Sequence, residues 1–212
     1  MALARIYLLR HGEIDTTYRG RFVGQVDLSL SESGKLQARL WERELSETEL
    51  NIIYCSDLER SKVTASIIAG ARKQNVEIIP ELREINLGDW EGMEIEQVKR
   101  VFAEQWRMRG MEIGNYRPPN GESFSDLASR VLPVFQSMVD NLKGNILIVG
   151  HSGVNRVILC HALGMPLTNL FNICQDYGCM NILEFSVGCL RLKAMNILPS
   201  VRTCKLTTAV CR

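Results

Sequence analysis

The stretch Ile6-Tyr7-Leu8-Leu9-Arg10-His11-Gly12-Glu13 decides the fold class of this chain. Its first four residues form a short apolar run that predicts a buried strand. The strand then stops at two nitrogen-rich side chains, Arg10 and His11. In open α/β sheets, ligands bind at the carboxyl ends of the strands. Gly12 would let the backbone turn sharply there and let a ligand approach closely. Taken alone, the four residues after the run could also be a surface turn that holds a histidine.

Strand-like and helix-like segments alternate along the rest of the chain. The predicted strands are Ala4–Leu9, Asn51–Cys55, Val76–Pro80, Asn145–Gly150, Asn181–Ser186 and Leu190–Asn196. We expect the first four to be buried on both faces and the last two to form a hairpin at the sheet edge. The predicted helices are Lys35–Ser46 with Ser31 as its cap, Asp57–Ala71, Glu94–Arg109, Glu122–Leu142 and Ser152–Leu163. The alternation predicts an α/β fold, a three-layer αβα sandwich around a mostly parallel central sheet of about six strands.

One domain accounts for most of the chain. We expect it to span residues 1–198, with an excursion over the strand ends at 87–120 that is a candidate lid. The alternative for the excursion is a helix packed flat on the sheet. Trp90, within it, is expected to be a packing residue, and residues 199–212 are expected to form a weakly ordered tail.

Composition narrows the function classes. The chain has 212 residues, 46% of them apolar, and a net charge of +1, which gives no general preference for nucleic acid or an anionic membrane. No apolar run reaches the roughly 18 residues that a membrane span needs. Seven cysteines without a Cys-x-x-Cys pair and only three histidines argue against a zinc site. The first strand follows the N-terminus without the layout of a signal peptide, so we expect a cytoplasmic protein.

Four predicted strands end at chemically unusual places. The strand ends are followed by Arg10-His11, by Ser56 to Arg60, by Leu82-Arg83-Glu84, and by His151-Ser152 at a helix start. A parallel sheet would bring two arginines, two histidines and a glutamate to one edge. Arginine matches phosphate oxygens, and the helix that starts at Ser152 adds backbone N–H donors. A histidine among arginines stays neutral and nucleophilic. The natural reaction of such a cluster is phosphoryl transfer through a phosphohistidine, without a metal.

Six ordered pieces of the sequence resemble the histidine phosphatase superfamily, also called the phosphoglycerate mutase-like family, over roughly residues 4–195. They are Arg10-His11-Gly12-Glu13, Gly24-x-x-Asp27-x-x-Leu30-x-x-x-Gly34-x-x-Gln37-Ala38, Ser56-Asp57-Leu58-x-Arg60-x-x-x-Thr64-Ala65, Leu82-x-Glu84-x-x-x-Gly88-x-Trp90-Glu91-Gly92, Gly121-Glu122-Ser123 and Gly150-His151-Ser152-Gly153.

The resemblance implies a role for each matching residue. His11 would be the nucleophile, and Glu84 the acid that protonates the leaving group and then the base that activates water. The third catalytic residue would be His151, which with Arg10 and Arg60 would grip the phosphate. Family members usually carry asparagine six residues after the nucleophile, where this chain has Thr17. We expect that hydroxyl, and Ser152, to contact the phosphate, and we expect no cofactor or metal.

Several functions remain open at this stage. The compact span from Gly88 to Ser123 resembles the small phosphatase branch, which includes broad-specificity phosphatases and α-ribazole phosphatase. The expected partner is a small-molecule phosphate ester, and an edge strand such as Leu190–Asn196 would allow a homodimer. The alternatives are a phosphoglycerate mutase and a non-catalytic phosphate-binding module. An esterase is disfavoured because Gly150-His151-Ser152-Gly153-Val154 lacks the last glycine of the nucleophile elbow.

Overall fold

The computed structural model describes residues 3–70 and 74–200. Its strands form one six-stranded sheet in the order β3-β2-β4-β1-β5-β6. The strands are β1 (Ala4–Arg10), β2 (Ile52–Cys55), β3 (Val76–Ile78), β4 (Ile146–Gly150), β5 (Met180–Ser186) and β6 (Cys189–Ile197). All six strands predicted from the sequence are therefore present, with ends that differ by one or two residues.

The sheet is mostly parallel, as predicted. Strands β1, β4, β2 and β3 run parallel to one another, β5 runs antiparallel to β1, and β6 returns antiparallel to β5. The turn between β5 and β6 contains Val187 and Gly188, both with positive φ, at 50° and 74°. Two positive φ angles suit the twist of a tight hairpin turn. The predicted hairpin at the sheet edge is thus confirmed.

The expectation that the first four strands are buried on both faces is wrong for β3. Strand β4 is buried along its whole length, whereas β3 exposes Glu77 and half of Ile78. The reason is topological, because β3 lies at the edge of the sheet and pairs with β2 alone. A short apolar run does not distinguish a central strand from an edge strand.

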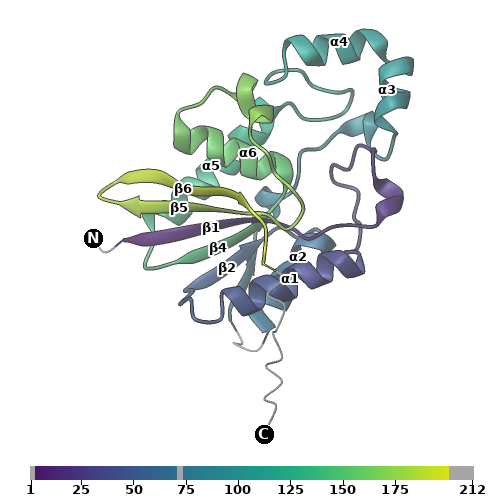
Figure 1. The fold of residues 1–212 in the computed structure, drawn as a ribbon. Helices are drawn as coiled ribbons and strands as arrows, with labels where there is room; N and C mark the ends of the chain where they lie inside the picture. Colours follow the sequence, from purple (N-terminus) through teal and green to yellow (C-terminus); the bar gives the residue numbers. More distant parts are fainter. Residues whose placement is uncertain (1–2, 71–73, 201–212) are drawn as a thin grey trace, which may run out of the picture.

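Helices cover both faces of the sheet, which confirms the three-layer architecture (Figure 1). On one face, α5 (Phe124–Asp140) and α6 (Ser152–Leu163) pack on Leu8 and Ile148. On the other face, α1 (Glu32–Glu44) and α2 (Glu59–Ala69) pack on Leu9 and Val149. Neighbouring residues of β1 and β4 thus enter different cores, as the alternation of side chains along a strand requires.

The predicted helix starts lie within three residues of the observed ones, with the largest difference at α1, which begins at Glu32 and not at Lys35. Ser31 caps α1, with its Oγ accepting a hydrogen bond from Gly34 N at 3.0 Å, and α6 starts at Ser152 as predicted. Helix α2 starts at Glu59, two residues later than predicted. Asp57 therefore lies outside the helix, where its carboxylate binds the Arg83 guanidinium through two hydrogen bonds of 2.7 and 2.6 Å. The predicted end of α2 at residue 71 lies outside the described residues.

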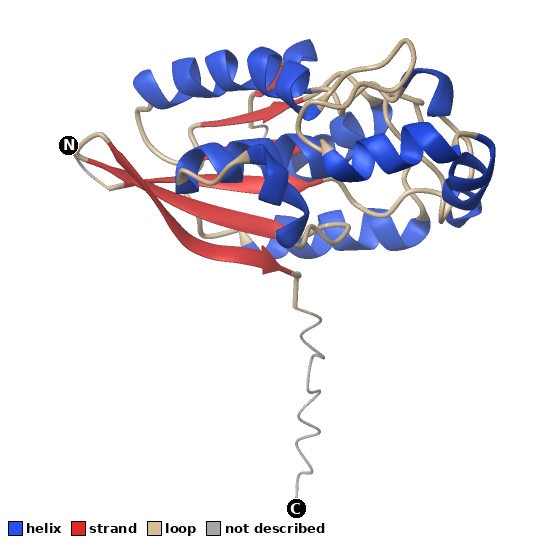
Figure 2. Ribbon diagram, turned by 90° about the horizontal axis from the view of Figure 1, so that it is seen from above, coloured by secondary structure: helices blue, strands red, loops and turns tan. Residues whose placement is uncertain are grey.

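The excursion contains two short helices where one was predicted. These are α3 (Ile95–Val101) and α4 (Ala103–Met111), which are separated at Phe102. Both stand beyond the carboxyl ends of the strands and do not lie flat on the sheet (Figure 1). The loops and short helices lie at this end of the molecule, opposite the amino ends of the parallel strands (Figure 2). The role of the excursion as a lid stays a prediction.

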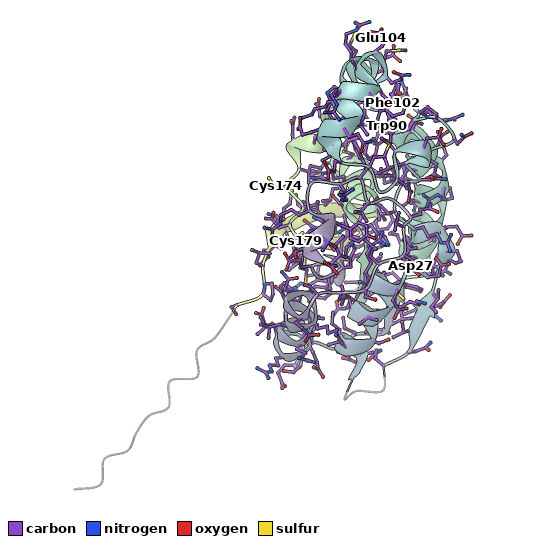
Figure 3. The ribbon with its side chains drawn as sticks, turned by 90° about the vertical axis from the view of Figure 1, so that its right-hand side faces the viewer. Asp27, Trp90, Phe102, Glu104, Cys174 and Cys179 are labelled. Carbon is purple, nitrogen blue, oxygen red and sulfur yellow. The ribbon has the colours of Figure 1, made fainter. Side chains whose placement is uncertain are left out.

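Trp90 packs the excursion against the rest of the protein. Its side chain is fully buried, and its ring centroid lies 5.5 Å from that of Phe22, 5.7 Å from that of Tyr116 and 6.3 Å from that of Phe102. Figure 3 shows Glu104 at the tip of the projection, with Phe102 and Trp90 below it. Trp90 is thus a packing residue, as the sequence predicted.

The boundary at residues 198 and 199 stays a prediction. Of the expected tail, the structure describes only Pro199 and Ser200, and the Ser200 hydroxyl donates to the Glu44 carboxylate at 2.7 Å. Residues 201–212 lie outside the described residues. Within residues 3–70 and 74–200, no helix is long and apolar enough to cross a membrane.

Candidate active site

The two predicted site histidines lie at the ends of neighbouring parallel strands. His11 follows β1, and its backbone N–H donates to the carbonyl of Gly150, the last residue of β4, at 3.1 Å. His151 follows Gly150 directly. The centroids of the two imidazole rings lie 5.1 Å apart, so the sheet brings the two residues together as expected.

The His11 imidazole is held with one nitrogen available. Its Nδ1 lies 2.8 Å from the Gly12 carbonyl oxygen. A carbonyl only accepts, so Nδ1 carries the hydrogen and Nε2 keeps its lone pair. Burial lowers the pKa of His11 well below its ordinary value, and the positive charges of Arg60 and Arg10 lower it further. A neutral imidazole with a free Nε2 is a nucleophile at neutral pH.

His151 is the second buried imidazole. Its Nε2 lies 2.7 Å from the hydroxyl of Ser56, and its Nδ1 has no hydrogen-bond partner among the described residues. Burial lowers the pKa of His151 well below its ordinary value, with further lowering by Arg60 and His11. An unpaired polar atom in a buried site is where a ligand atom would bind.

The positive charges of two predicted site arginines, Arg10 and Arg60, act on both histidines. Arg60 is almost fully buried in α2, where it donates to the carbonyls of Val26 at 2.7 Å and Gly24 at 2.6 Å. Arg10 donates to the carbonyl of Gln175 at 2.5 Å, and its guanidinium carbon lies 3.7 Å from the Tyr177 ring centroid. Neither arginine forms an ion pair with a carboxylate in the described part of the chain. Their charges are therefore available to an anion.

Glu84 is the carboxylate of the site. Both of its carboxylate oxygens accept from Gly153 N, at 3.1 and 3.0 Å, and one accepts from Ile85 N at 2.9 Å. A Cβ atom at residue 153 would lie 2.4 Å from Glu84 Oε1, so this contact requires glycine. Glu91, the nearest competitor in sequence, instead accepts from the backbone of Gln25 and Leu87 at 2.7 and 3.1 Å.

A cleft of about 300 Å³ opens beside Arg10 and Glu84, and the buried His11, His151 and Arg60 are not among the residues that line it. Ser152 lies in its wall, and the Ser152 hydroxyl accepts a hydrogen bond from Arg156, one helical turn further along α6. Apolar, aromatic and charged side chains form the rest of the wall. The lining residues are Arg10, Arg21, Phe22, Val23, Glu84, Ile85, Leu87, Ile95, Arg109, Phe124, Ser152, Gly153, Arg156, Phe171 and Tyr177.

Unlike the predicted site residues Arg10, Glu84 and Ser152, Thr17 does not line the cleft. It is exposed in the short 3-10 helix Thr16–Tyr18. Its backbone N and its Oγ1 both donate to the carboxylate of Asp15 at 2.9 Å. Asp15 caps this short helix, and the cap engages the Thr17 hydroxyl in a hydrogen bond to a carboxylate.

The sequence analysis missed Tyr177 and Arg156. Arg156 follows Ser152 by four residues on one helix, so its place beside Ser152 follows from helical spacing. Tyr177 lies in a loop before β5, and no pattern in the sequence marks it. Among the described residues, no three histidine, cysteine, aspartate or glutamate side chains form a group that could hold a metal ion.

The chain is an α/β enzyme of the phosphatase class. The chain belongs to the histidine phosphatase superfamily (branch 1), whose profile matches residues 6–198. The resemblance stated from the sequence motifs is thereby confirmed.

The most similar proteins include phosphatases of different substrates. The adenosylcobalamin/alpha-ribazole phosphatase of Salmonella typhimurium is 31% identical over 194 residues, which cover 91% of this chain and 96% of the relative. Phosphoserine phosphatase 1 of Hydrogenobacter thermophilus is 33% identical over 207 residues, or 96% and 95% of the two chains. The crystal structure of the alpha-ribazole phosphatase from Shigella flexneri has a TM-score of 0.83 at 30% identity, covering 91% and 96%.

Proposed function

We propose that this chain is a metal-independent phosphomonoesterase that forms a phosphohistidine on His11. The observation that carries the proposal is the pair of neutral imidazoles, 5.1 Å apart, beside Arg10 and Arg60, which have no carboxylate partner in the described residues. In this proposal Arg10, Arg60, His151 and Ser152 bind the phosphate oxygens. The two guanidinium groups then stabilise the charge that spreads over the phosphoryl oxygens.

The proposed reaction has two steps, and both are substitutions at the phosphorus atom of the ester. First, His11 Nε2 attacks phosphorus, the P–O bond to the leaving group breaks, and a proton from the Glu84 carboxyl goes to the leaving oxygen. Second, Glu84 takes a proton from water, the water oxygen attacks phosphorus, and the P–N bond breaks. Inorganic phosphate leaves, and His11 and Glu84 return to their starting forms.

We propose α-ribazole 5′-phosphate as the substrate to test first. Two of the similar proteins are named alpha-ribazole phosphatases, and most of the cleft wall away from Arg10 is apolar or aromatic. Such a wall suits a leaving group with a large apolar part. Phosphoserine is the natural comparison, because another relative is named for it.

The experiment is hydrolysis of p-nitrophenyl phosphate in excess chelator, with wild type beside His11→Ala. We expect turnover by wild type and a loss of at least about 10³-fold in the variant, because the nucleophile is removed. Acid-labile, radiolabelled phosphate should appear on the wild-type chain alone. Wild-type rates of hydrolysis in His11→Ala would contradict the phosphohistidine mechanism.

Inactivity of both proteins toward phosphate esters would direct the next test to the alternatives. Interconversion of phosphoglycerates would then indicate a mutase, and phosphate binding without any transfer would indicate a binding module.

We also propose a homodimer paired along the edge strand β6 and a cytoplasmic location. Sedimentation velocity and fractionation of cells test them.

A further inference from the structure

Arg109 lies in the cleft without a polar partner. It belongs to α4 of the excursion, and its side chain lines the same cleft as Arg10 and Glu84. Within residues 3–70 and 74–200, the Arg109 guanidinium has no hydrogen bond and no ion pair. Burial lowers its pKa from the ordinary value. A partly dehydrated guanidinium without acceptors is costly, which suggests that a ligand completes its surroundings.

Two neighbouring arginines, Arg107 and Arg21, are paired with carboxylates. Arg107, two residues earlier in α4, binds Glu104 with hydrogen bonds of 3.1 and 2.6 Å. Arg21, in the cleft wall, binds Glu94 at 2.8 Å. Arg109 therefore differs from these two neighbours; Arg100 of α3, which also forms no ion pair among the described residues, is exposed and does not line the cleft.

Aromatic rings surround the Arg109 guanidinium. Its central carbon lies 5.2 Å from the Trp106 ring centroid, 5.4 Å from that of Phe171 and 5.9 Å from that of Phe22. The ring of Phe124, also in the cleft wall, meets Phe171 edge to face at 5.6 Å. A planar cation beside several rings is a surface on which another planar ring can stack.

We infer that Arg109, Phe22 and Phe171 form a subsite that binds a planar heteroaromatic group of the leaving alcohol. The inference rests on the proposed phosphomonoesterase function and names the part of the ester that this chain selects. The ring would lie on the guanidinium and against the two phenylalanines, while the phosphate lies between Arg10, Arg60 and the histidines. Arg109 is thus a specificity residue and takes no part in the chemical steps.

A ring suits this subsite better than a second anionic group. Arg156 also lies near Phe171, with its guanidinium carbon 5.1 Å from the ring centroid, but it already donates to the Ile173 carbonyl and the Ser152 hydroxyl. A carboxylate beside Arg109 would therefore meet one guanidinium without a hydrogen bond and otherwise face aromatic rings, which offer it few hydrogen bonds. A planar ring bound in the same place would instead leave water and contact apolar side chains on every side. In addition, the cleft of about 300 Å³ is of the size that bulky ligands fill, and a phosphorylated three-carbon acid would leave much of it empty.

The test compares two esters that differ only in the base, α-ribazole 5′-phosphate and ribose 5-phosphate. We expect wild type to hydrolyse the base-bearing ester with the higher kcat/KM. Arg109→Leu should lower kcat/KM for that ester about tenfold, the size of a partly desolvated cation–π contact, and leave kcat/KM for ribose 5-phosphate within about twofold. Phe171→Leu, at a half-exposed position, should act in the same direction.

The control variant is Arg107→Leu, on the same helix with its side chain 61% exposed, which should change neither ester. Calorimetric binding of α-ribazole without its phosphate gives a readout that needs no turnover, and Arg109→Leu should weaken it about tenfold.

Three results would overturn the inference. They are equal rates of wild type on the two esters, equal losses on both esters in Arg109→Leu, and a wild-type preference for phosphoserine that Arg109→Leu loses and Arg109→Lys keeps. The last result would identify an anion subsite. None of these coincides with failure of the proposed function, which would show as absence of phosphohistidine in wild type.

Discussion

The backbone N–H of Gly153 fixes the position of the Glu84 carboxylate. The two carboxylate oxygens lie 3.1 and 3.0 Å from Gly153 N, at the amino end of α6. Because residue 153 has no side chain, the carboxylate reaches the helix end and still faces the cleft. The position of Glu84 is thus set by a backbone donor on another element, and its proposed role depends on carrying a proton.

Glu84→Gln tests that role through the leaving group. The variant cannot give a proton to the departing oxygen, so hydrolysis of an alkyl phosphate should fall by about 10² to 10⁴-fold. Transfer from p-nitrophenyl phosphate should fall much less, since p-nitrophenolate leaves without a proton. Single-turnover formation of phosphohistidine measures this first step apart from the second.

Glu91→Gln is the matched control, because its carboxylate binds the backbone of Gln25 and Leu87 and does not line the cleft. It should leave the preference between the two esters unchanged. Equal losses for both esters in Glu84→Gln, or a leaving-group effect in Glu91→Gln, would move the acid role away from Glu84.

At the scale of elements, α5 holds the segment that carries Glu84. Arg130 of α5 donates to the carbonyls of Glu81 at 2.6 Å, Arg83 at 2.9 Å and Glu84 at 3.3 Å. The same guanidinium binds both carboxylate oxygens of Glu122, at 3.0 and 2.8 Å. Glu122 precedes the cap residue Ser123, so it is not the first helical residue. Its carboxylate instead orients the arginine that holds the Glu84 segment.

Arg130→Leu should reduce catalysis by displacing Glu84 slightly. We expect kcat for an alkyl phosphate to fall about 10- to 100-fold, since small misplacements of a reacting group are costly, with a smaller effect on p-nitrophenyl phosphate and on KM. Arg130→Lys should restore part of the rate. In the control, Arg117→Leu, an exposed pair with Asp126 at the same helix is lost, and the rates should stay unchanged. A purely structural role would instead lower both esters equally, together with the Tm.

The elements themselves were largely predictable, and the errors have physical causes. Hydrophobic periodicity and the Ser31 cap are local signals, so they located α1, and the strand ends were correct to one or two residues. The exposure of β3 depends on which strand stands next to it, which is a property of the assembled sheet. The break at Phe102 and the pairing of Asp57 with Arg83 likewise depend on contacts between segments distant in the chain.

At the scale of the whole molecule, topology explains how much of the site could be predicted. Parallel strands bring their carboxyl ends to one edge, so Arg10, His11 and His151 followed from the strand predictions alone. The place of Arg109 depends on how the excursion packs beyond the carboxyl ends of the strands, and no local pattern contains that information. Thr17 was carried over from a family position, and the local Asp15 cap decides its orientation.

The two buried histidines also make the stability of the whole protein depend on pH. Burial lowers the pKa of both His11 and His151 well below the ordinary value near 6.5. In the unfolded chain both would have ordinary values, so below about pH 6.5 the unfolded state binds more protons than the folded state. The free energy of unfolding is therefore fully retained above that pH and falls as the pH drops, by up to about 1.4 kcal/mol per pH unit for each histidine.

Urea unfolding at pH 7.5, 6.5 and 5.5 measures this slope, in a range above the titration of ordinary carboxylates. His11→Ala and His151→Ala should each remove about half of it. His161→Gln is the matched control, because His161 is exposed on α6, and the slope of this variant should equal that of wild type. A wild-type slope near zero between pH 6.5 and 5.5 would mean that the folded protein takes up protons at His11 and His151 as readily as the unfolded chain. In that case His11 would be largely cationic below pH 6.5, and the acid limb of kcat/KM would lie near that pH instead of well below it.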